Sequence, residues 1–304
     1  MADYSRFDAA IVPWLKTVWK DRAVIEKGVR DRSRQEGAWL IYDRYNDPTY
    51  LKERVGAWDS FKRHRDKLIS KYGVRCGPQD GEEVSNDFYH FGNNCRPGKG
   101  MWRVYVHVTS RRINWIPVID YCLSVMTKKK LEDIEKCKVA GPCMSRDRGD
   151  QVVIWVNSEA AKDKTLEDLK KISDRFGGSV PPGVKQVIPG LGWGVEPSGA
   201  DHGSPAIDEV YEGQGVSFGS YLAAVIYMAL EQSWHKSEEE YVEEQVQFFL
   251  NVGVDPKNPH LLRTYSWDQV KQMTQVSNAK LVSSGVGTSS TVFTDKTNVV
   301  PSLL

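Results

Sequence analysis

The amino-acid sequence predicts an α+β fold, on the strength of two kinds of side-chain spacing. Residues 7–29 and 50–73 place aromatic and aliphatic side chains three and four positions apart, which is typical of helices that bury one face. Residues 102–108 instead alternate polar and apolar side chains, which indicates a half-buried strand. Residues 151–157 are rich in β-branched and aromatic side chains and predict a second strand.

The segments between and after these strands complete the predicted order of elements. A Gly-, Asn- and Pro-rich loop is expected between about residues 74 and 100, ahead of the first strand. Residues 113–126 predict a helix that tolerates Pro117 in its first turn. Residues 163–178 predict another helix, which stops at its two terminal glycines. Residues 178–216 are again rich in Gly and Pro, and we expect a long functional or mobile loop there.

The C-terminal part predicts two further helices. Residues 221–230 are apolar on all sides, which is typical of a central buried helix. Ser237 and Glu240 have the spacing of a capping box, and the helix that follows them is expected to end at Gly253.

The length of 304 residues suits one large domain or two modest ones. We expect a helical region over residues 1–95 and an α+β core over residues 96–275, continuous with each other in one domain. The polar stretch over residues 276–304, rich in Ser, Thr and Val, predicts a disordered tail.

Charge and hydropathy exclude several classes of function. The chain has 41 basic and 40 acidic residues, a balance that argues against a general nucleic-acid binder. Residues 101–150 carry a local basic excess, which suits a local anionic ligand. No apolar run is long enough to span a membrane and no signal core is present, so we expect a cytoplasmic protein. A non-classical secretion route into a host cell would leave no mark in the sequence.

The five cysteines are odd in number and form no Cys-x-x-Cys pair, which fits a reducing compartment. Neither they nor the six histidines have the spacing of a metal site, so we expect no metal or other cofactor. Cys137 and Cys143 are interpreted as buried thiols.

The candidate functional residues begin on the first predicted strand, where Arg103, Tyr105 and His107 share one face. His90 is interpreted as a packing residue. Further basic residues follow downstream, namely Arg111, Arg112, Lys136, Lys138, Arg146 and Arg148. From charge alone, a solvated basic surface explains them as well as an anion site does.

The order of these residues resembles the core of bacterial phosphothreonine lyases. A strand that carries His107 is followed by a helix, by Lys138-Val139 31 residues later, and by an Arg before a second aromatic strand. Further along, Glu196-Pro197 and Ser217-Phe218-Gly219 are similar to segments of the HopA-type effector family of plant-pathogenic bacteria. The same region resembles the lyase component of class V lanthipeptide synthetases. The resemblance covers roughly residues 100–235.

The resemblance implies a phosphoserine or phosphothreonine lyase that needs no cofactor, built as a helical part packed on a twisted, mainly antiparallel sheet with flanking helices. It implies Lys138 as the base and His107 as the general acid. Its substrate would be a phosphorylated peptide or protein, in peptide maturation beside a partner Ser/Thr kinase or in a host. The residues implied in binding phosphate or substrate are Arg148, Arg146, Arg103, Tyr105, Lys136 and Ser217.

Two positions depart from the family pattern. Tyr105 stands where the phosphothreonine lyases have a lysine, and Leu222 lies where HopA-type proteins carry an arginine. Because of these departures, a second hypothesis is that the protein is a binding module that recognises phosphopeptides without turnover. A lesser alternative is an ADP-ribosyltransferase, although the segment around Glu244 predicts a helix and not the loop and strand that this class requires. Ser217 is equally interpreted as a plain helix N-cap.

Overall fold

The computed structural model describes residues 2–30, 32–46, 56–79, 81–92, 102–109, 113–128, 133–144, 148–195, 210 and 217–261. The helices within these ranges are α1 (Val12–Val29), α2 (Arg34–Asn46), α3 (Ala57–Tyr72), α4 (Trp115–Thr127), α5 (Glu159–Lys170), α7 (Phe218–Glu231) and α8 (Glu238–Asn251). Three short 3-10 helices lie at Tyr4–Arg6, Ser173–Arg175 and Pro259–Leu261.

Seven strands form one sheet in which every neighbouring pair is antiparallel. The strands are β1 (Arg75–Pro78), β2 (Phe88–Gly92), β3 (Trp102–Val106), β4 (Ile134–Ala140), β5 (Val152–Val156), β6 (Lys185–Ile188) and β7 (Leu191–Val195). Their order across the sheet is β1-β2-β4-β5-β3-β7-β6, so strands distant in the sequence become neighbours at its centre. The predicted α+β class with a mainly antiparallel sheet is confirmed.

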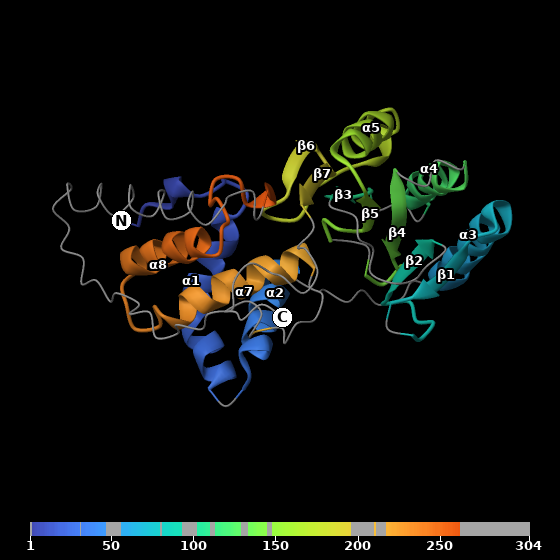
Figure 1. The fold of residues 1–304 in the computed structure, drawn as a ribbon. Coiled ribbons are helices and arrows are strands. Elements are labelled where there is room, and N and C mark those ends of the chain that lie inside the picture. The colour runs from blue at the N-terminus through green and yellow to red at the C-terminus, as the bar shows by residue number, and fades with distance from the viewer. Residues whose placement is uncertain are drawn as a thin grey trace, which may run out of the picture.

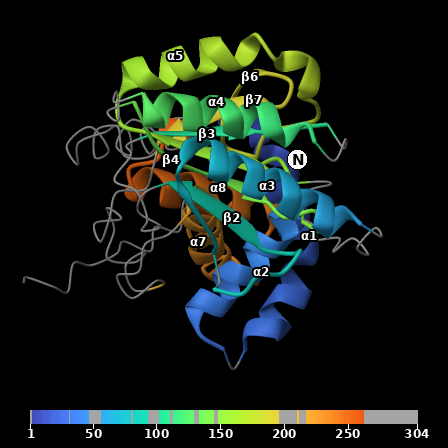
Figure 2. The same ribbon diagram turned by 90° about the vertical axis from the view of Figure 1, so that its right-hand side faces the viewer.

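Helices cover both faces of the sheet and make two separate cores (Figure 1). One core joins α3, α4 and α5 to side chains such as Val104 and Ile154. The other joins α1, α2, α7 and α8 to Tyr105, Val153 and Trp155 on the opposite face. Figure 2 shows the same layers from the side, with α4 and α5 on one side of the sheet and α2 and α7 on the other. We call the face that looks toward α2 and α7 the inner face.

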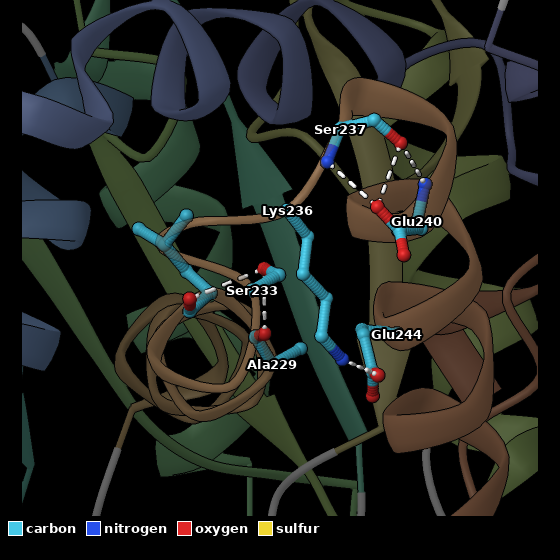
Figure 3. Close-up of polar contacts among 7 residues, drawn as sticks. Ala229, Ser233, Lys236, Ser237, Glu240 and Glu244 are labelled. Atoms are coloured by element: carbon cyan, nitrogen blue, oxygen red, sulfur yellow. Dashed lines mark hydrogen bonds and ion pairs between the residues drawn. The ribbon is translucent and has the colours of Figure 1, made fainter. Parts of the chain in front are cut away.

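α4, α7 and α8 begin and end within a few residues of the predicted bounds, whereas α2 was not predicted as a separate helix. α7 is buried along its whole length, as its apolar sequence indicates. α8 begins with the predicted capping box, in which Ser237 N donates to Glu240 Oε2 at 2.8 Å and Glu240 N donates to Ser237 Oγ at 3.3 Å (Figure 3). Lys236 Nζ donates to Glu244 one turn further along α8.

Two predicted loops contain strands instead. The segment between residues 74 and 100 holds β1 and β2, so part of the expected helical region belongs to the sheet. The expected loop over residues 178–216 holds the hairpin of β6 and β7. The helix predicted at residues 163–178 begins earlier, at Glu159 behind the N-cap Ser158, and ends at Lys170. The predicted tail at residues 276–304 lies outside the described residues.

The β6–β7 hairpin resembles a loop in sequence because it contains several glycines. These glycines are needed where the chain turns and where neighbouring atoms lie very close to the backbone. Gly190 turns the chain with a φ of 74°, a backbone conformation that favours glycine. A Cβ atom on Gly192 would lie 2.7 Å from the Lys185 carbonyl oxygen, and one on Gly194 would lie 3.3 Å from the Phe218 ring. The strand therefore uses glycine because its neighbours pass so close. None of the helices described here is long and apolar enough to cross a membrane.

Candidate functional site

The register of four adjacent strands brings the candidate residues to one region of the inner face. Lys138 on β4 pairs with His90 on β2 and with Val153 on β5, and Val153 pairs in turn with Tyr105 on β3. One pleat along, Trp155 pairs with both Lys136 and Arg103. Because alternate residues of a strand share a face, these side chains all lie on the inner face.

Four cations stand over two aromatic rings in this region. The Lys138 Nζ lies 3.8 Å from the centroid of the Phe88 ring, and the Arg148 guanidinium carbon lies 5.1 Å from it. The Lys136 Nζ and the Arg103 guanidinium carbon lie 4.2 and 4.9 Å from the centroid of the Trp155 ring. Lys136 and Arg103 are only 4% and 7% exposed. We call Arg103, Lys136, Lys138 and Arg148 the cationic cluster.

The buried carboxylate of Asp150 balances part of this charge. Arg148 donates from Nε to Asp150 Oδ1 at 2.8 Å and from Nη2 to Asp150 Oδ2 at 3.0 Å, a two-point grip that fixes the guanidinium plane. Although burial opposes it, Arg148 holds the pKa of the Asp150 carboxyl below its usual range. Asp150 thus offsets one of the positive charges of the cluster.

The pKa of the Lys138 amine is lowered by its surroundings. Burial lowers the pKa of its amine to about 7, aided by the charges of Arg103, Arg148 and Lys136 and opposed by Asp150. Near neutral pH a large fraction of Lys138 is therefore uncharged and able to accept a proton.

His90 lies beside this amine and was not predicted to take part. Burial, followed by the charges of Lys138, Lys136 and Arg103, lowers the pKa of His90 to about 3. Its Nδ1 is buried and has no hydrogen-bond partner among the described residues, and its ring lies 5.9 Å from the Trp155 ring. Lys138 Nζ and His90 Nε2 both approach Gln79 Oε1, at 3.3 and 3.5 Å.

His107 lies at the edge of this region, just beyond the end of β3. Its Nδ1 donates to the Ser179 carbonyl oxygen at 2.9 Å, which leaves Nε2 as the nitrogen that can exchange a proton with a ligand. Strands are spaced about 4.8 Å apart and rise about 3.4 Å per residue, so the Cα atoms of His107 and Lys138 lie roughly 12 Å apart. The two side chains can flank one substrate but do not touch.

The other predicted residues differ in their surroundings. Tyr105 is buried in the core with its ring 6.3 Å from that of Phe218, and burial raises the pKa of its hydroxyl. Ser217 is the N-cap of α7, where its Oγ accepts from Ser220 N at 3.1 Å. Leu222 fills the core at the position where the family pattern has an arginine, and a Cβ atom on Gly183 would meet it at 2.5 Å. Arg111, Arg112, Arg146 and Glu196 lie outside the described residues.

Three residues of the site were missed from the sequence, namely His90, Asp150 and Gln79. Phe88 and His90 alternate with the buried Tyr89 and Phe91, which is a strand pattern hidden in a Gly-rich stretch. Asp150 gives no such signal, although the Arg148 side chain from which it accepts hydrogen bonds lies only two residues away.

Comparison with known proteins places this geometry in a family. The profile of the HopA1 effector protein family matches residues 79–261. An effector protein from Pseudomonas syringae pv. tomato strain DC3000 has a similar structure, with a TM-score of 0.56 and 19% identity over 83% of this chain and 100% of that one. An effector protein from Pseudomonas syringae pv. syringae strain 61 gives a TM-score of 0.58 and 17% identity over 86% of this chain and 99% of that one.

No curated protein matches the sequence significantly. At such low identity the two structures establish the fold alone, and it is the fold described above. The family profile spans more than half of the chain and includes β2, β3, β4 and β5, which carry the cationic cluster. The chain therefore belongs to the HopA1 effector protein family.

Proposed function

We propose that this protein is a phosphoserine or phosphothreonine lyase, which removes phosphate from a peptide or protein by β-elimination. One observation carries the proposal: Lys138, with a pKa lowered to about 7, lies among three cations that are suited to hold a phosphate. An unprotonated base beside an anion site is what the reaction requires, because the base must accept the Cα proton. The substrate would be supplied by a Ser/Thr kinase.

In this reaction Lys138 Nζ takes the Cα proton of the phosphorylated residue. The electrons of the Cα–H bond form a double bond between Cα and Cβ, and the bond from Cβ to the phosphate oxygen breaks. Phosphate leaves with that bonding pair, so the product is dehydroalanine or dehydrobutyrine. In this step the Lys138 amine gains a positive charge and the leaving oxygen gains a negative charge. A neutral amine is therefore needed to take the proton, and fixed cations are needed to stabilise the leaving oxygen.

The phosphate itself is held by the other members of the cluster. Arg103 and Lys136 share the Trp155 ring, and Arg148 is fixed in orientation by Asp150. Guanidinium groups bind phosphate oxygens in pairs and stabilise the charge that develops on the leaving group. A negative charge held there also helps a neighbouring group to take up a proton.

Two histidines are candidates for the acid that protonates the leaving oxygen. The family resemblance favours His107, whereas the direct pairing with Lys138 favours His90. Burial is the largest cause of the low pKa of His90, and the charges of Lys138, Lys136 and Arg103 add to it. A bound phosphate dianion offsets those charges, so we expect it to raise the pKa of His90.

Mass spectrometry of a phosphothreonine peptide tests the proposal. Elimination removes the mass of phosphoric acid and leaves a double bond that adds a thiol, whereas hydrolysis removes only the phosphoryl group and restores threonine. We expect elimination with the native chain and none with Lys138→Ala. Lys67→Ala is the matched control, since Lys67 is exposed on α3, which packs on the other face of the sheet. Hydrolysis, or activity in Lys138→Ala, contradicts the proposal.

A binding module without turnover is the second candidate, and the core positions of Tyr105 and Leu222 favour it. Both residues are buried. By the resemblance, the phosphothreonine lyases have a lysine in place of Tyr105 and the HopA-type proteins an arginine in place of Leu222, so a phosphate receives fewer contacts here. On this account the native chain binds a phosphopeptide and leaves it intact, and Lys138→Ala binds it as well.

A further inference from the structure

The helix α2 has two apolar sides, of which one is left partly open. Ala38 and Ile41 are fully buried in the helical core against α7. Trp39 and Tyr42 stand three positions apart and therefore share a different side of the helix. Trp39 is 44% exposed, which is unusual for so large an apolar side chain on a helix that is otherwise well packed.

A chain of contacts connects Trp39 to the cationic cluster. The Trp39 and Tyr42 rings meet edge to face, with centroids 5.4 Å apart at 84°. The Tyr42 hydroxyl accepts a hydrogen bond from Arg148 Nη2 at 3.4 Å, and the same guanidinium group grips Asp150. The exposed indole therefore lies at the margin of the region where we place the phosphate.

We propose that Trp39 and Tyr42 form a recognition surface for the substrate peptide, which takes a large apolar side chain near the phosphorylated residue. This inference rests on the proposed function, since it names the second feature by which the same site selects a substrate. The occupant must carry a phosphate for Arg148 and an aromatic or branched aliphatic group for the indole. Tryptophan and tyrosine are the residues that most often dominate the energy of such contacts.

The spacing of the contacts limits where that apolar side chain can be. The Tyr42 side chain lies between the Trp39 ring and Arg148, so the length of one tyrosine side chain separates the indole from the guanidinium group. An extended peptide advances about 3.3 Å per residue, so the indole meets a side chain roughly three residues from the phosphorylated one. A nearer neighbour would contact Tyr42 instead.

α2 is held firmly enough to act as a fixed surface. Gly37 packs so tightly against α7 that a Cβ atom there would lie 2.3 Å from the Tyr227 ring. Buried Ile41 anchors the next turn of the helix, and its carbonyl oxygen accepts from Trp14 Nε1 at 3.2 Å. Recognition residues on a rigid element lose little freedom on binding and so contribute more to selectivity.

Phosphothreonine peptides that differ only by Phe or Ala at single positions up to four residues from the phosphate provide the test. Equilibrium binding is measured by fluorescence anisotropy with Lys138→Ala, which cannot consume the peptide, and kcat/KM is measured with the native chain. We expect about tenfold tighter binding with Phe at one position near the third. Trp39→Ala, added to each chain, removes that preference and leaves binding of the Ala peptide unchanged. Trp39→Phe keeps most of the preference.

Val24→Ala is the matched control, because Val24 is an exposed apolar residue on α1 and is 66% exposed. It should leave the preference intact, and thermal unfolding should be the same for all variants. The inference is overturned if Trp39→Ala keeps the preference, weakens both peptides equally, or acts equally on unphosphorylated peptides. If the native chain eliminates phosphate but shows no preference for the Phe peptides, only this inference is refuted. If it prefers the Phe peptides but does not eliminate phosphate, only the proposed lyase activity is refuted. If no phosphopeptide binds, both proposals are refuted.

Discussion

At the scale of single residues, Lys138 is balanced between charges of both signs. Burial favours its neutral form most, and Arg103, Arg148 and Lys136 add to this effect, whereas Asp150 favours its charged form. His90 and Gln79 also lie beside the amine. Because Asp150 also grips Arg148, one carboxylate sets both the orientation of a phosphate ligand and the pKa of the base.

Asp150→Asn should therefore move the pH dependence of elimination. Elimination needs neutral Lys138, so in the native chain kcat/KM rises with pH through about 7. Removing the Asp150 charge lowers the pKa of Lys138 further, and the rise shifts to lower pH. A purely structural role would lower kcat/KM at every pH without this shift. Asp120→Asn, on α4 and paired with Lys71, is the control and should leave the profile unchanged.

Exchange of each histidine for asparagine should identify the general acid. If His90 protonates the leaving oxygen, His90→Asn lowers kcat by about 100-fold or more, and His107→Asn has a much smaller effect. We expect this outcome because His90 is paired with Lys138. The reverse order of effects would assign the acid to His107.

Lys138→Met should stabilise the folded protein. A lysine whose pKa falls from 10.5 to about 7 on folding destabilises the fold most below pH 7, and the effect fades as pH rises toward 10.5. Substitution removes the buried charge, so we expect a gain on the order of 1 kcal/mol near pH 6 and a smaller gain near pH 9. Urea unfolding at the two pH values measures this difference. An equal gain at both values would mean that the pKa of Lys138 is not lowered.

At the scale of elements, α2 joins the helical layer to the site. Gly37 allows close contact with α7, and Tyr42 on the same helix contacts Arg148 above the sheet. A change in how α2 packs is therefore transmitted to the phosphate site without any change in the cluster itself.

Gly37→Ala tests this connection. Alanine favours a helix, but its Cβ would lie 2.3 Å from the Tyr227 ring, so we expect a net destabilisation of about 1–3 kcal/mol and weaker phosphopeptide binding. Gly28→Ala on α1 is the matched control, since its Cβ would meet only the flexible end of Leu40 at 3.2 Å. Equal unfolding free energies for the two variants would contradict this packing.

At the scale of the whole molecule, the sequence reveals the parts of the fold that have strong local patterns. The helices α1, α3, α4, α7 and α8 and the strands β3 and β5 follow from the spacing of apolar residues. β1, β2 and β7 are short strands that contain glycine or proline, and β6 is a four-residue strand that joins β7 in a hairpin. β2 and β7 also pair with strands that lie far away in the sequence. Local composition therefore makes them resemble loops.

The candidate site likewise contains residues that the sequence indicates and contacts that it does not. Arg103, Lys136, Lys138 and Arg148 stand out in the sequence as basic residues, and the structure brings all four to one face of the sheet. His90 faces Lys138 because of the register between β2 and β4. No local sequence pattern specifies this register. The same holds for Tyr42, whose contact with Arg148 joins separate parts of the chain.

The central claim is that Lys138 is largely uncharged near neutral pH among neighbouring cations. NMR titration of lysines labelled with ¹³C at Cε, assigned by the loss of one signal in Lys138→Met, measures this protonation directly and needs no substrate. We expect one lysine to titrate near pH 7, as the pKa of about 7 predicts. Titration of Lys138 near its ordinary value of 10.5 would contradict the account.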